Sequence, residues 1–390
     1  MRLFLSLAAS LALASCATTP MEAQLATKSA PSEPLPQSDG GPLFWNQTLR
    51  TERFRSMETH FAGLETGAAA KTRVLARGKA LAAEDVASFQ PFLDTMNAAG
   101  MMVLQDGKVR CEVYRLGLKP EDRWTSFSVA KSFTSTLLGA AVKDGYLQLS
   151  DPVTKYLPGL VGSAYDGVTV EQVATMTSGV AWNENYTDPK SDVAQMLSVQ
   201  PVPGEPQSVT YAKTLKRQVR PGGKWVYKTL ETNLLGDIVS AAVGEDLASY
   251  AKSRIVDPAG FAGSLFWMTD LSDRPIAGCC VSVRLSDYAR MGQWVMEGGQ
   301  PSVPTDWFAN AGAPQVDLGD GYGYGYQWWT FPGGDFGAQG IFGQYITIMP
   351  DRRTVVAVVS SNKAPTSKDL TAARRGLWDA VTKAVDRPAQ

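Results

Sequence analysis

Ser128 and Lys131 lie three residues apart in Ser128-Val129-Ala130-Lys131, at the start of a predicted helix. On a helix this spacing places both side chains on one face, with Cβ atoms roughly 5–6 Å apart. A serine hydroxyl becomes a strong nucleophile only when a nearby base removes its proton, and a neutral lysine can be that base. The pair therefore predicts covalent catalysis on Ser128, with simple helix capping by Ser128 as the alternative.

Lys131 can act as this base only if its pKa falls from about 10.4 toward 7, through burial or neighbouring positive charge. Other bases are scarce, because His60 is the one histidine and precedes the main body of the chain. A His-rich metal site is excluded, and without a Cys-x-x-Cys pair a cysteine zinc site is not expected either. We therefore expect no metal and no cofactor.

The composition is that of a folded domain without the charge pattern of a nucleic-acid-binding protein. The chain has 390 residues, 44% of them hydrophobic and 19% charged, which allows two domains or one large α/β body with an inserted lobe. Lys and Arg number 37 against 38 Asp and Glu, without long basic blocks. We therefore expect no nucleic-acid partner.

The N-terminus predicts export. A positive start, Met1-Arg2, precedes an apolar stretch to Ala14 that is too short to span a bilayer. It ends in Leu13-Ala14-Ser15-Cys16, which resembles the lipobox of bacterial lipoproteins. We predict a signal peptide over residues 1–16 and lipidation of Cys16, with an ordinary signal peptide and a chance cysteine as the alternative.

This prediction makes the mature protein an exported lipoprotein, held at the periplasmic face of a membrane by its lipid anchor only. Ala17, in place of the aspartate linked with inner-membrane retention, favours the outer membrane. Residues 17–45 are rich in Pro, Ser, Thr and Gln and predict a flexible spacer before a domain over residues 46–390. Among the remaining cysteines, adjacent Cys279 and Cys280 are expected to be reduced, with a vicinal bridge as the alternative.

The elements that must hold the serine and lysine form an α+β pattern. Alternating runs on either side of Asp106-Gly107 predict a hairpin, and a buried helix follows over residues 128–143. Residues 151–290 mix helical stretches, such as 234–243 and 285–296, with Pro- and Gly-rich loops, and predict an inserted, mainly helical lobe. Strands are predicted at 322–331, 340–349 and 354–361, and a helix at 370–385. This order predicts a central antiparallel sheet flanked by helices, with a cleft against the lobe.

Four segments together resemble the serine β-lactamase and penicillin-binding-protein superfamily. They are Trp-Thr-Ser-Phe-Ser-Val-Ala-Lys-Ser-Phe at 124–133, Val-Ala-Thr-Met-Thr-Ser-Gly-Val at 173–180, Pro-Gly-Gly-Lys-Trp-Val-Tyr-Lys-Thr at 221–229 and Leu-Ser-Asp-Tyr-Ala-Arg at 285–290. They occur in the family's order, and the resemblance covers about residues 90–385. The nearest branch contains class C β-lactamases, esterases and 6-aminohexanoate-dimer hydrolases.

The resemblance implies a β-lactamase-like fold and a role for each matching residue. Ser128 matches the acylated serine, Lys131 its base, and Tyr227 the tyrosine that carries protons between nucleophile and leaving group. A core aromatic is the alternative for Tyr227. Thr229 occupies the position where β-lactamases have Asn, and its hydroxyl favours the amidase or esterase branch.

The third family motif departs from the β-lactamase pattern. Ala338-Gln339-Gly340 stands where β-lactamases carry Lys-Thr-Gly and many esterases His-x-Gly, which argues against efficient lactam turnover. Gln339 and Gly340 would lie along the substrate. By analogy, the backbone N–H groups of Ser128 and Ile341 would form the oxyanion hole.

The segment 183–189 resembles the loop whose tyrosine folds over the substrate in 6-aminohexanoate-dimer hydrolases. Tyr186 is the matching residue, with a surface aromatic as the alternative. Leu197 replaces the acidic residue that one dimer-hydrolase lineage has eleven positions later, which disfavours nylon-oligomer cleavage. The aromatics Tyr322, Tyr324, Tyr326, Trp328 and Trp329 could floor an apolar acyl pocket or belong to the core.

These observations predict a serine hydrolase that cleaves a small carboxylic ester or amide through an acyl-enzyme on Ser128. One alternative is a D,D-peptidase or β-lactamase acting on peptidoglycan-like substrates. The other is a catalytically idle, envelope-binding lipoprotein, which the intact set of Ser128, Lys131 and Tyr227 disfavours.

Overall fold

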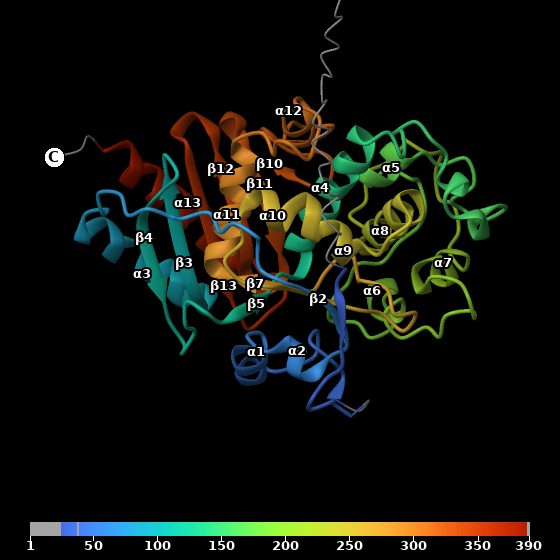
Figure 1. Cartoon of the computed structure of the whole chain (residues 1–390), viewed down its shortest axis with the longest axis horizontal. Coiled ribbons are helices and arrows are strands. Elements are labelled where there is room, and N and C mark those ends of the chain that lie inside the picture. Colours follow the sequence, from blue (N-terminus) through green and yellow to red (C-terminus); the bar gives the residue numbers. More distant parts are fainter. Residues whose placement is uncertain (1–24, 37–38, 388–390) are drawn as a thin grey trace, which may run out of the picture.

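A computed structural model describes residues 25–36 and 39–387 (Figure 1). Cys16 and the predicted signal peptide lie outside the described residues. Within the described ranges no helix has the length and apolar character needed to cross a bilayer. A sheet-centred body lies on one side of Figure 1 and a helical lobe on the other, and together they form the predicted α+β fold.

The main sheet has eight strands, and each strand is antiparallel to its neighbours. The predicted hairpin supplies one edge, and the strands from the C-terminal third supply the rest. In spatial order the strands are β4 (Lys108–Tyr114), β3 (Ala98–Gln105), β13 (Thr354–Ser360), β12 (Gln344–Met349), β11 (Phe336–Gly340), β10 (Trp329–Thr330), β9 (Tyr322–Tyr324) and β8 (Val316–Gly319).

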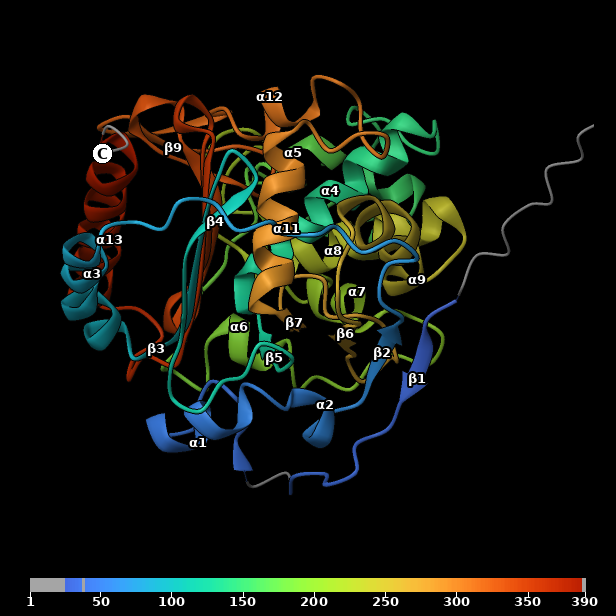
Figure 2. The same cartoon turned by 60° about the vertical axis from the view of Figure 1, so that its left-hand side comes forward.

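Helices cover both faces of this sheet (Figure 2). On one face lie α3 (Ala83–Met96) and α13 (Lys368–Asp386), and on the other lies α11 (Leu285–Met296). The buried side chains of α13 recur every three or four residues, which gives one apolar stripe toward the sheet; they are Leu370, Ala373, Leu377, Val381, Ala384 and Val385. Because this stripe packs against the sheet, the other side chains of α13 point away from that contact.

A second sheet has five strands in the order β1 (Thr27–Ser29), β2 (Gly63–Thr66), β6 (Leu265–Met268), β7 (Val281–Arg284) and β5 (Arg123–Thr125). Its strand β1 lies within the stretch predicted as a flexible spacer and pairs with β2. Trp45, at the end of that stretch, is only 2% exposed. The expectation of a flexible spacer is therefore wrong at β1 and at Trp45, which both pack on the domain. The pairing of β1 was not predicted because backbone hydrogen bonds between strands require no side-chain periodicity.

The helical lobe is built around two buried helices, α4 (Ala130–Lys143) and α8 (Thr229–Val243), which pack on each other. Smaller helices surround them: α5 (Val170–Ala174), α6 (Asp192–Gln195), α7 (Gln207–Ala212), α9 (Leu247–Ala251) and α10 (Asp257–Ala259). The predicted lobe boundaries, 151–290, need correction, because β6 and β7 belong to the second sheet and α11, which starts at Leu285, packs on the main sheet. Outside the lobe are α1 (Gln47–Arg53), α2 (Met57–His60) and α12 (Trp307–Ala311).

Two predicted strands are each interrupted. The segment 322–331 contains β9 and β10, separated by a turn in which Gln327 has φ 61°. The segment 340–349 begins with a turn at Ile341–Gly343, where Phe342 has φ 61° and Gly343 φ 98°, before β12 starts. Apolar residues continue through these turns, so the sequence pattern alone did not reveal them.

The structure joins Cys279 and Cys280 in a disulfide, whereas Cys111 is free and buried. The expectation of two reduced thiols is therefore wrong, and the alternative holds. The two cysteines lie in the turn that precedes β7, where Cys280 has φ 72°. This turn brings the adjacent sulfur atoms together.

Candidate active site

Ser128 lies in a short 3-10 turn, Phe127–Val129, between β5 and α4. The turn directs Ser128 to the N-terminal end of α4, where free N–H groups and the helix dipole favour negative charge. The residue is 8% exposed, so its hydroxyl is nearly enclosed by the fold.

Lys131 follows one helical turn later and is 1% exposed. Its Nζ lies 3.2 Å from Ser128 Oγ, 3.0 Å from Thr229 Oγ1 and 2.7 Å from the carbonyl oxygen of Gly278. Burial lowers the pKa of Lys131 to about 8, although the negative charge of Glu184 opposes this shift. A substantial fraction of the amine is therefore neutral near physiological pH.

The contacts of Lys131 also determine where a neutral amine would point its lone pair. Thr229 Oγ1 donates its own proton to Glu184, so it can only accept from Lys131. The Gly278 carbonyl is likewise an acceptor. With its two N–H groups used by these acceptors, the neutral amine presents its lone pair to the hydroxyl of Ser128.

Tyr227 lies two residues before the start of α8, and its hydroxyl hydrogen-bonds the side chain of Ser128. The Lys131 Nζ lies 5.2 Å from the centre of its ring, and the indole of Trp329 stacks on it at 5.6 Å. Burial raises the pKa of Tyr227, and the charge of Glu184 raises it further. Tyr227 is therefore a neutral phenol, suited to donate a proton.

Glu184 is a site residue that the sequence analysis missed. Its carboxylate accepts from the Thr229 backbone N–H at 3.0 Å, from the Tyr186 hydroxyl at 2.8 Å, and from the Thr229 hydroxyl and the Trp182 indole N–H. It thus caps the N-terminus of α8 and orients Thr229 toward Lys131. Glu184 lies two residues before Tyr186, in the segment 183–189 that the sequence analysis had already singled out, and this position could have pointed to it.

The end of β11 approaches Ser128 closely. A Cβ atom at Gly340 would lie 2.7 Å from the carbonyl oxygen of Ser126 and 3.1 Å from the amide nitrogen of Ser128. Only glycine fits this approach without moving backbone atoms. The following residue, Ile341, lines the same cavity as Ser128.

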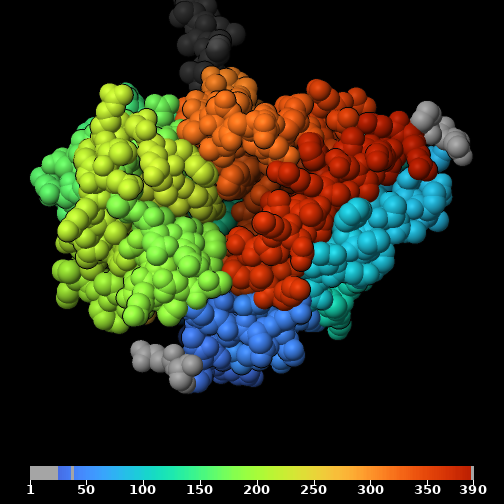
Figure 3. All heavy atoms as spheres, turned by 180° about the vertical axis from the view of Figure 1, so that it is seen from behind, coloured from blue at the N-terminus to red at the C-terminus, as the bar shows by residue number. Residues whose placement is uncertain are grey.

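One cavity of about 270 Å³ collects most of the predicted site residues. Its lining comes from the helical lobe and from the C-terminal part of the chain, and Figure 3 shows the surface hollowed between these two parts. Lys131 and Thr229 do not line the cavity, and Lys131 reaches it through its contact with Ser128. Its lining comprises Ser128, Glu184, Tyr186, Tyr227, Trp329, Gln339, Gly340, Ile341, Pro365, Thr366, Leu370, Thr371 and Arg374.

Of the five aromatic residues predicted for the acyl pocket, some line cavities and others lie in the hydrophobic core. Trp329 lines the cavity, whereas Trp328, Tyr324 and Tyr326 are buried at 0%, 1% and 7% exposure. Tyr322 lines an adjoining cavity of about 270 Å³. Trp329 alone among the five thus contributes to the wall beside Ser128.

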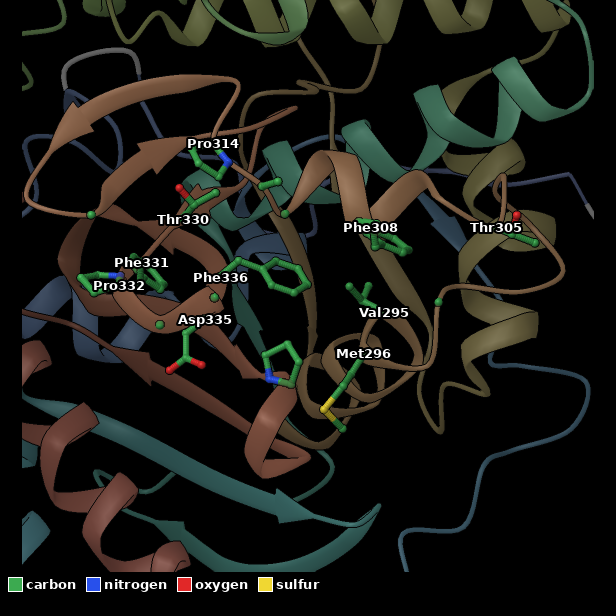
Figure 4. Close-up of a pocket in the computed structure, with 18 residues that line it drawn as sticks. Val295, Met296, Thr305, Phe308, Pro314, Thr330, Phe331, Pro332, Asp335 and Phe336 are labelled. Atoms are coloured by element: carbon green, nitrogen blue, oxygen red, sulfur yellow. The ribbon is translucent and has the colours of Figure 1, made fainter.

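A separate cavity of about 580 Å³ lies between α11, α12 and the turn that joins β10 to β11 (Figure 4). Its walls are mainly apolar, with Phe308, Phe331 and Phe336 among them, and it contains none of the residues around Ser128. Within residues 25–36 and 39–387, no group of three His, Cys, Asp or Glu side chains is placed to hold a metal ion.

Comparison with known proteins assigns the chain to a family. The family model described as Beta-lactamase matches residues 87–381. The chain belongs to the beta-lactamase family. This match begins within α3 and ends within α13, and it includes every residue of the Ser128 cavity.

A curated relative from Paenarthrobacter ureafaciens, 6-aminohexanoate-dimer hydrolase, is 28% identical to this member of the beta-lactamase family. The alignment covers 73% of this chain and 78% of the relative. Among solved structures, a Bacillus anthracis protein provisionally described as a 6-aminohexanoate-dimer hydrolase matches with a TM-score of 0.76 and 19% identity, over 87% of this chain and 95% of its own. A class C β-lactamase matches with a TM-score of 0.59 and 17% identity, over 78% of this chain and 98% of its own. The predicted fold family is confirmed, and the chain is a hydrolase of this family.

Proposed function

We propose that this protein cleaves a carboxylic ester or amide through an acyl-enzyme formed on Ser128. The observation that carries the proposal is the buried Lys131 amine, 3.2 Å from Ser128 Oγ and with its pKa lowered to about 8 by burial. The similarity to a 6-aminohexanoate-dimer hydrolase supports hydrolysis of an acyl bond.

In the proposed reaction, Ser128 Oγ attacks the substrate carbonyl while Lys131 Nζ accepts its proton. The backbone N–H groups of Ser128 and Ile341 stabilise the oxyanion, at the point where Gly340 allows close approach. Tyr227 donates a proton to the leaving alcohol or amine and is reprotonated from Lys131. Water then attacks the acyl-enzyme, and the same groups return the proton to Ser128.

An assay of 4-nitrophenyl butyrate and nitrocefin hydrolysis tests this proposal, together with intact-mass analysis after treatment with a fluorophosphonate. We expect ester turnover and a single adduct that maps to Ser128. Replacing exposed Ser198 by alanine is the control and should leave the adduct in place. Nitrocefin turnover would favour the β-lactamase alternative, and inertness in every assay would favour the binding lipoprotein.

The kcat/KM for an ester should rise as the pH increases through about 8, because the base must be unprotonated. Below that value the neutral fraction of Lys131 falls about tenfold per pH unit. A pH profile with a neutral 4-nitrophenyl ester measures this rise of kcat/KM, the alkaline-going limb of the profile. A rate independent of pH between 6 and 9 would contradict an amine base.

Glu184→Gln should move the rise of kcat/KM with pH, the limb described above, to lower pH. The carboxylate stabilises the ammonium form of Lys131, so its removal lowers the pKa of the amine. The glutamine retains a side-chain oxygen that can accept from Thr229, which limits the structural change. Glu121→Gln, at an exposed position, is the matched control and should leave the limb in place. A shift to higher pH would refute the electrostatic role of Glu184.

A further inference from the structure

The turn at residues 276–280 supplies one of the contacts that hold the Lys131 amine. Lys131 Nζ donates to the carbonyl oxygen of Gly278 at 2.7 Å. Gly278 directly precedes Cys279 and Cys280, which the structure joins in a disulfide. A change at the two cysteines that moves the Gly278 carbonyl therefore also changes how the amine is held.

Gly278 is buried between α8 and Lys131. Its backbone N–H donates to Asn233 Oδ1 at 2.8 Å, one helical turn after Thr229. A Cβ atom at Gly278 would lie 2.8 Å from Thr229 Cγ2 and 3.0 Å from the Thr229 carbonyl oxygen, so only glycine fits this approach. The position of the carbonyl toward Lys131 therefore depends on the shape of the turn.

Cys280 links this turn to the strand that supports the nucleophile. Its φ of 72° lies in the left-handed region, which is unfavourable for a residue with a Cβ atom. Val281, the next residue, begins β7, and its backbone N–H donates to Ser126 Oγ at 3.0 Å, two residues before Ser128. The disulfide thus lies between the acceptor of the Lys131 amine and the support of the Ser128 turn.

The disulfide ties the side chain of Cys280 to its neighbour and so restricts the backbone between them. Cys279 is partly exposed, whereas Cys280 is 4% exposed, so we expect a small dithiol to attack from the side of Cys279. The dithiol passes two electrons and two protons to the sulfur atoms, breaks the S–S bond and becomes a disulfide itself. Cys280 is then free to leave the left-handed region, which rotates the peptide groups that follow Gly278.

We propose that the Cys279–Cys280 disulfide is a positioning element of the Lys131 amine, and that its reduction to two thiols slows the attack of Ser128 on an acyl substrate. With the bond intact, the Gly278 carbonyl occupies one N–H of the neutral amine and the lone pair points to Ser128. After reduction the carbonyl is no longer fixed and the lone pair loses its orientation. This inference rests on the proposed acyl-enzyme function and adds its control by thiols.

The first test measures kcat/KM for 4-nitrophenyl butyrate before and after treatment with dithiothreitol, which is then removed by desalting under nitrogen. A positioned base contributes about 10²- to 10⁴-fold, so partial loss of its orientation predicts a fall of about tenfold. Reoxidation should restore the rate, and far-UV circular dichroism should not change. Peptide mapping after alkylation with iodoacetamide should find Cys279 and Cys280 modified only in the reduced sample.

The second test uses the paired variant Cys279→Ser with Cys280→Ser, which has no thiol in the turn that could titrate beside Lys131. A carbonyl acceptor stabilises the ammonium form, so loss of this contact lowers the pKa of the amine and moves the limb to lower pH. Glu184 and Tyr227 face the amine in both proteins. Partial unfolding would lower the plateau of kcat/KM without moving the limb.

The matched control is Cys111→Ala, which removes a free, buried cysteine from β4 and should retain both the rate and its sensitivity to dithiothreitol. If the paired serine variant does not fold, the reversible loss of activity in wild type decides alone.

Three results would overturn the inference: alkylation of Cys279 and Cys280 without reduction, an unchanged kcat/KM after reduction, or a serine variant whose limb is unmoved or lies at higher pH. Equal hydrolysis in both redox states refutes this inference alone. Absence of hydrolysis and of fluorophosphonate labelling in the oxidised protein refutes the proposed function, and this inference with it.

Discussion

Lys131→Met is expected to lower kcat/KM for a neutral ester by about 10³-fold, which corresponds to about 4 kcal/mol of transition-state stabilisation. The structure gives the reason, because the Nζ atom is the base candidate in contact with Ser128 Oγ, at 3.2 Å. Methionine retains the length and the apolar stem of the side chain but has no basic nitrogen. Steady-state kinetics with 4-nitrophenyl butyrate measure the effect.

The matched control is Lys143→Met, at the exposed C-terminal end of the same helix, which should retain wild-type kinetics. Lys131 is 1% exposed, and replacing a buried amine by an apolar chain of similar volume should not destabilise the fold strongly. Far-UV circular dichroism and thermal unfolding verify this. A folded Lys131→Met protein within tenfold of wild-type kcat/KM would exclude lysine as the base.

Lys228→Met is expected to destabilise the protein by about 3–5 kcal/mol. The Lys228 Nζ lies 3.2 Å from Glu231 Oε1, and both side chains are fully buried. Removing the lysine leaves the carboxylate without a counter-charge, although Ser178 and Tyr165 still donate to it. Urea unfolding measures the loss. Lys213→Met, which breaks an ion pair at the surface, should cost at most about 1 kcal/mol.

This destabilisation should depend on pH with a defined sign. Burial raises the pKa of Glu231 in the folded protein above the value of about 4.3 for an unfolded chain. Between these two values the folded state binds more protons, so stability falls as the pH rises. Without Lys228 the folded-state pKa rises further. The loss should therefore be smaller at pH 5 than at pH 8, and equal losses would contradict an uncompensated charge.

The serine and lysine could be placed from the sequence because their relation is local. A spacing of three residues on a helix fixes their proximity, and the motif order around Tyr227 and Gly340 added the family resemblance. The helix at 285–296 and the C-terminal helix were likewise predicted by periodic apolar residues within a single segment. Each of these predictions depended on short stretches of chain.

The features that escaped prediction depend on distant contacts. Glu184 acts through Thr229, 45 positions away, and Arg374 enters the cavity only because α13 packs on the sheet. The pairing of β1 with β2 depends on backbone hydrogen bonds, which leave no mark in the composition of residues 27–29. The turn at Ile341–Gly343 depends on positive φ angles inside an apolar run.

The walls around Ser128 come from widely separated parts of the chain, and this has a consequence during synthesis. Ser128 and Lys131 leave the ribosome before Gly340 and the α13 wall are translated. A nascent chain therefore carries the serine and its amine without an enclosure that expels water from around them. If the proposed mechanism holds, we expect chemical competence only after β11 and α13 have docked, and chains that lack these elements are expected to be inert.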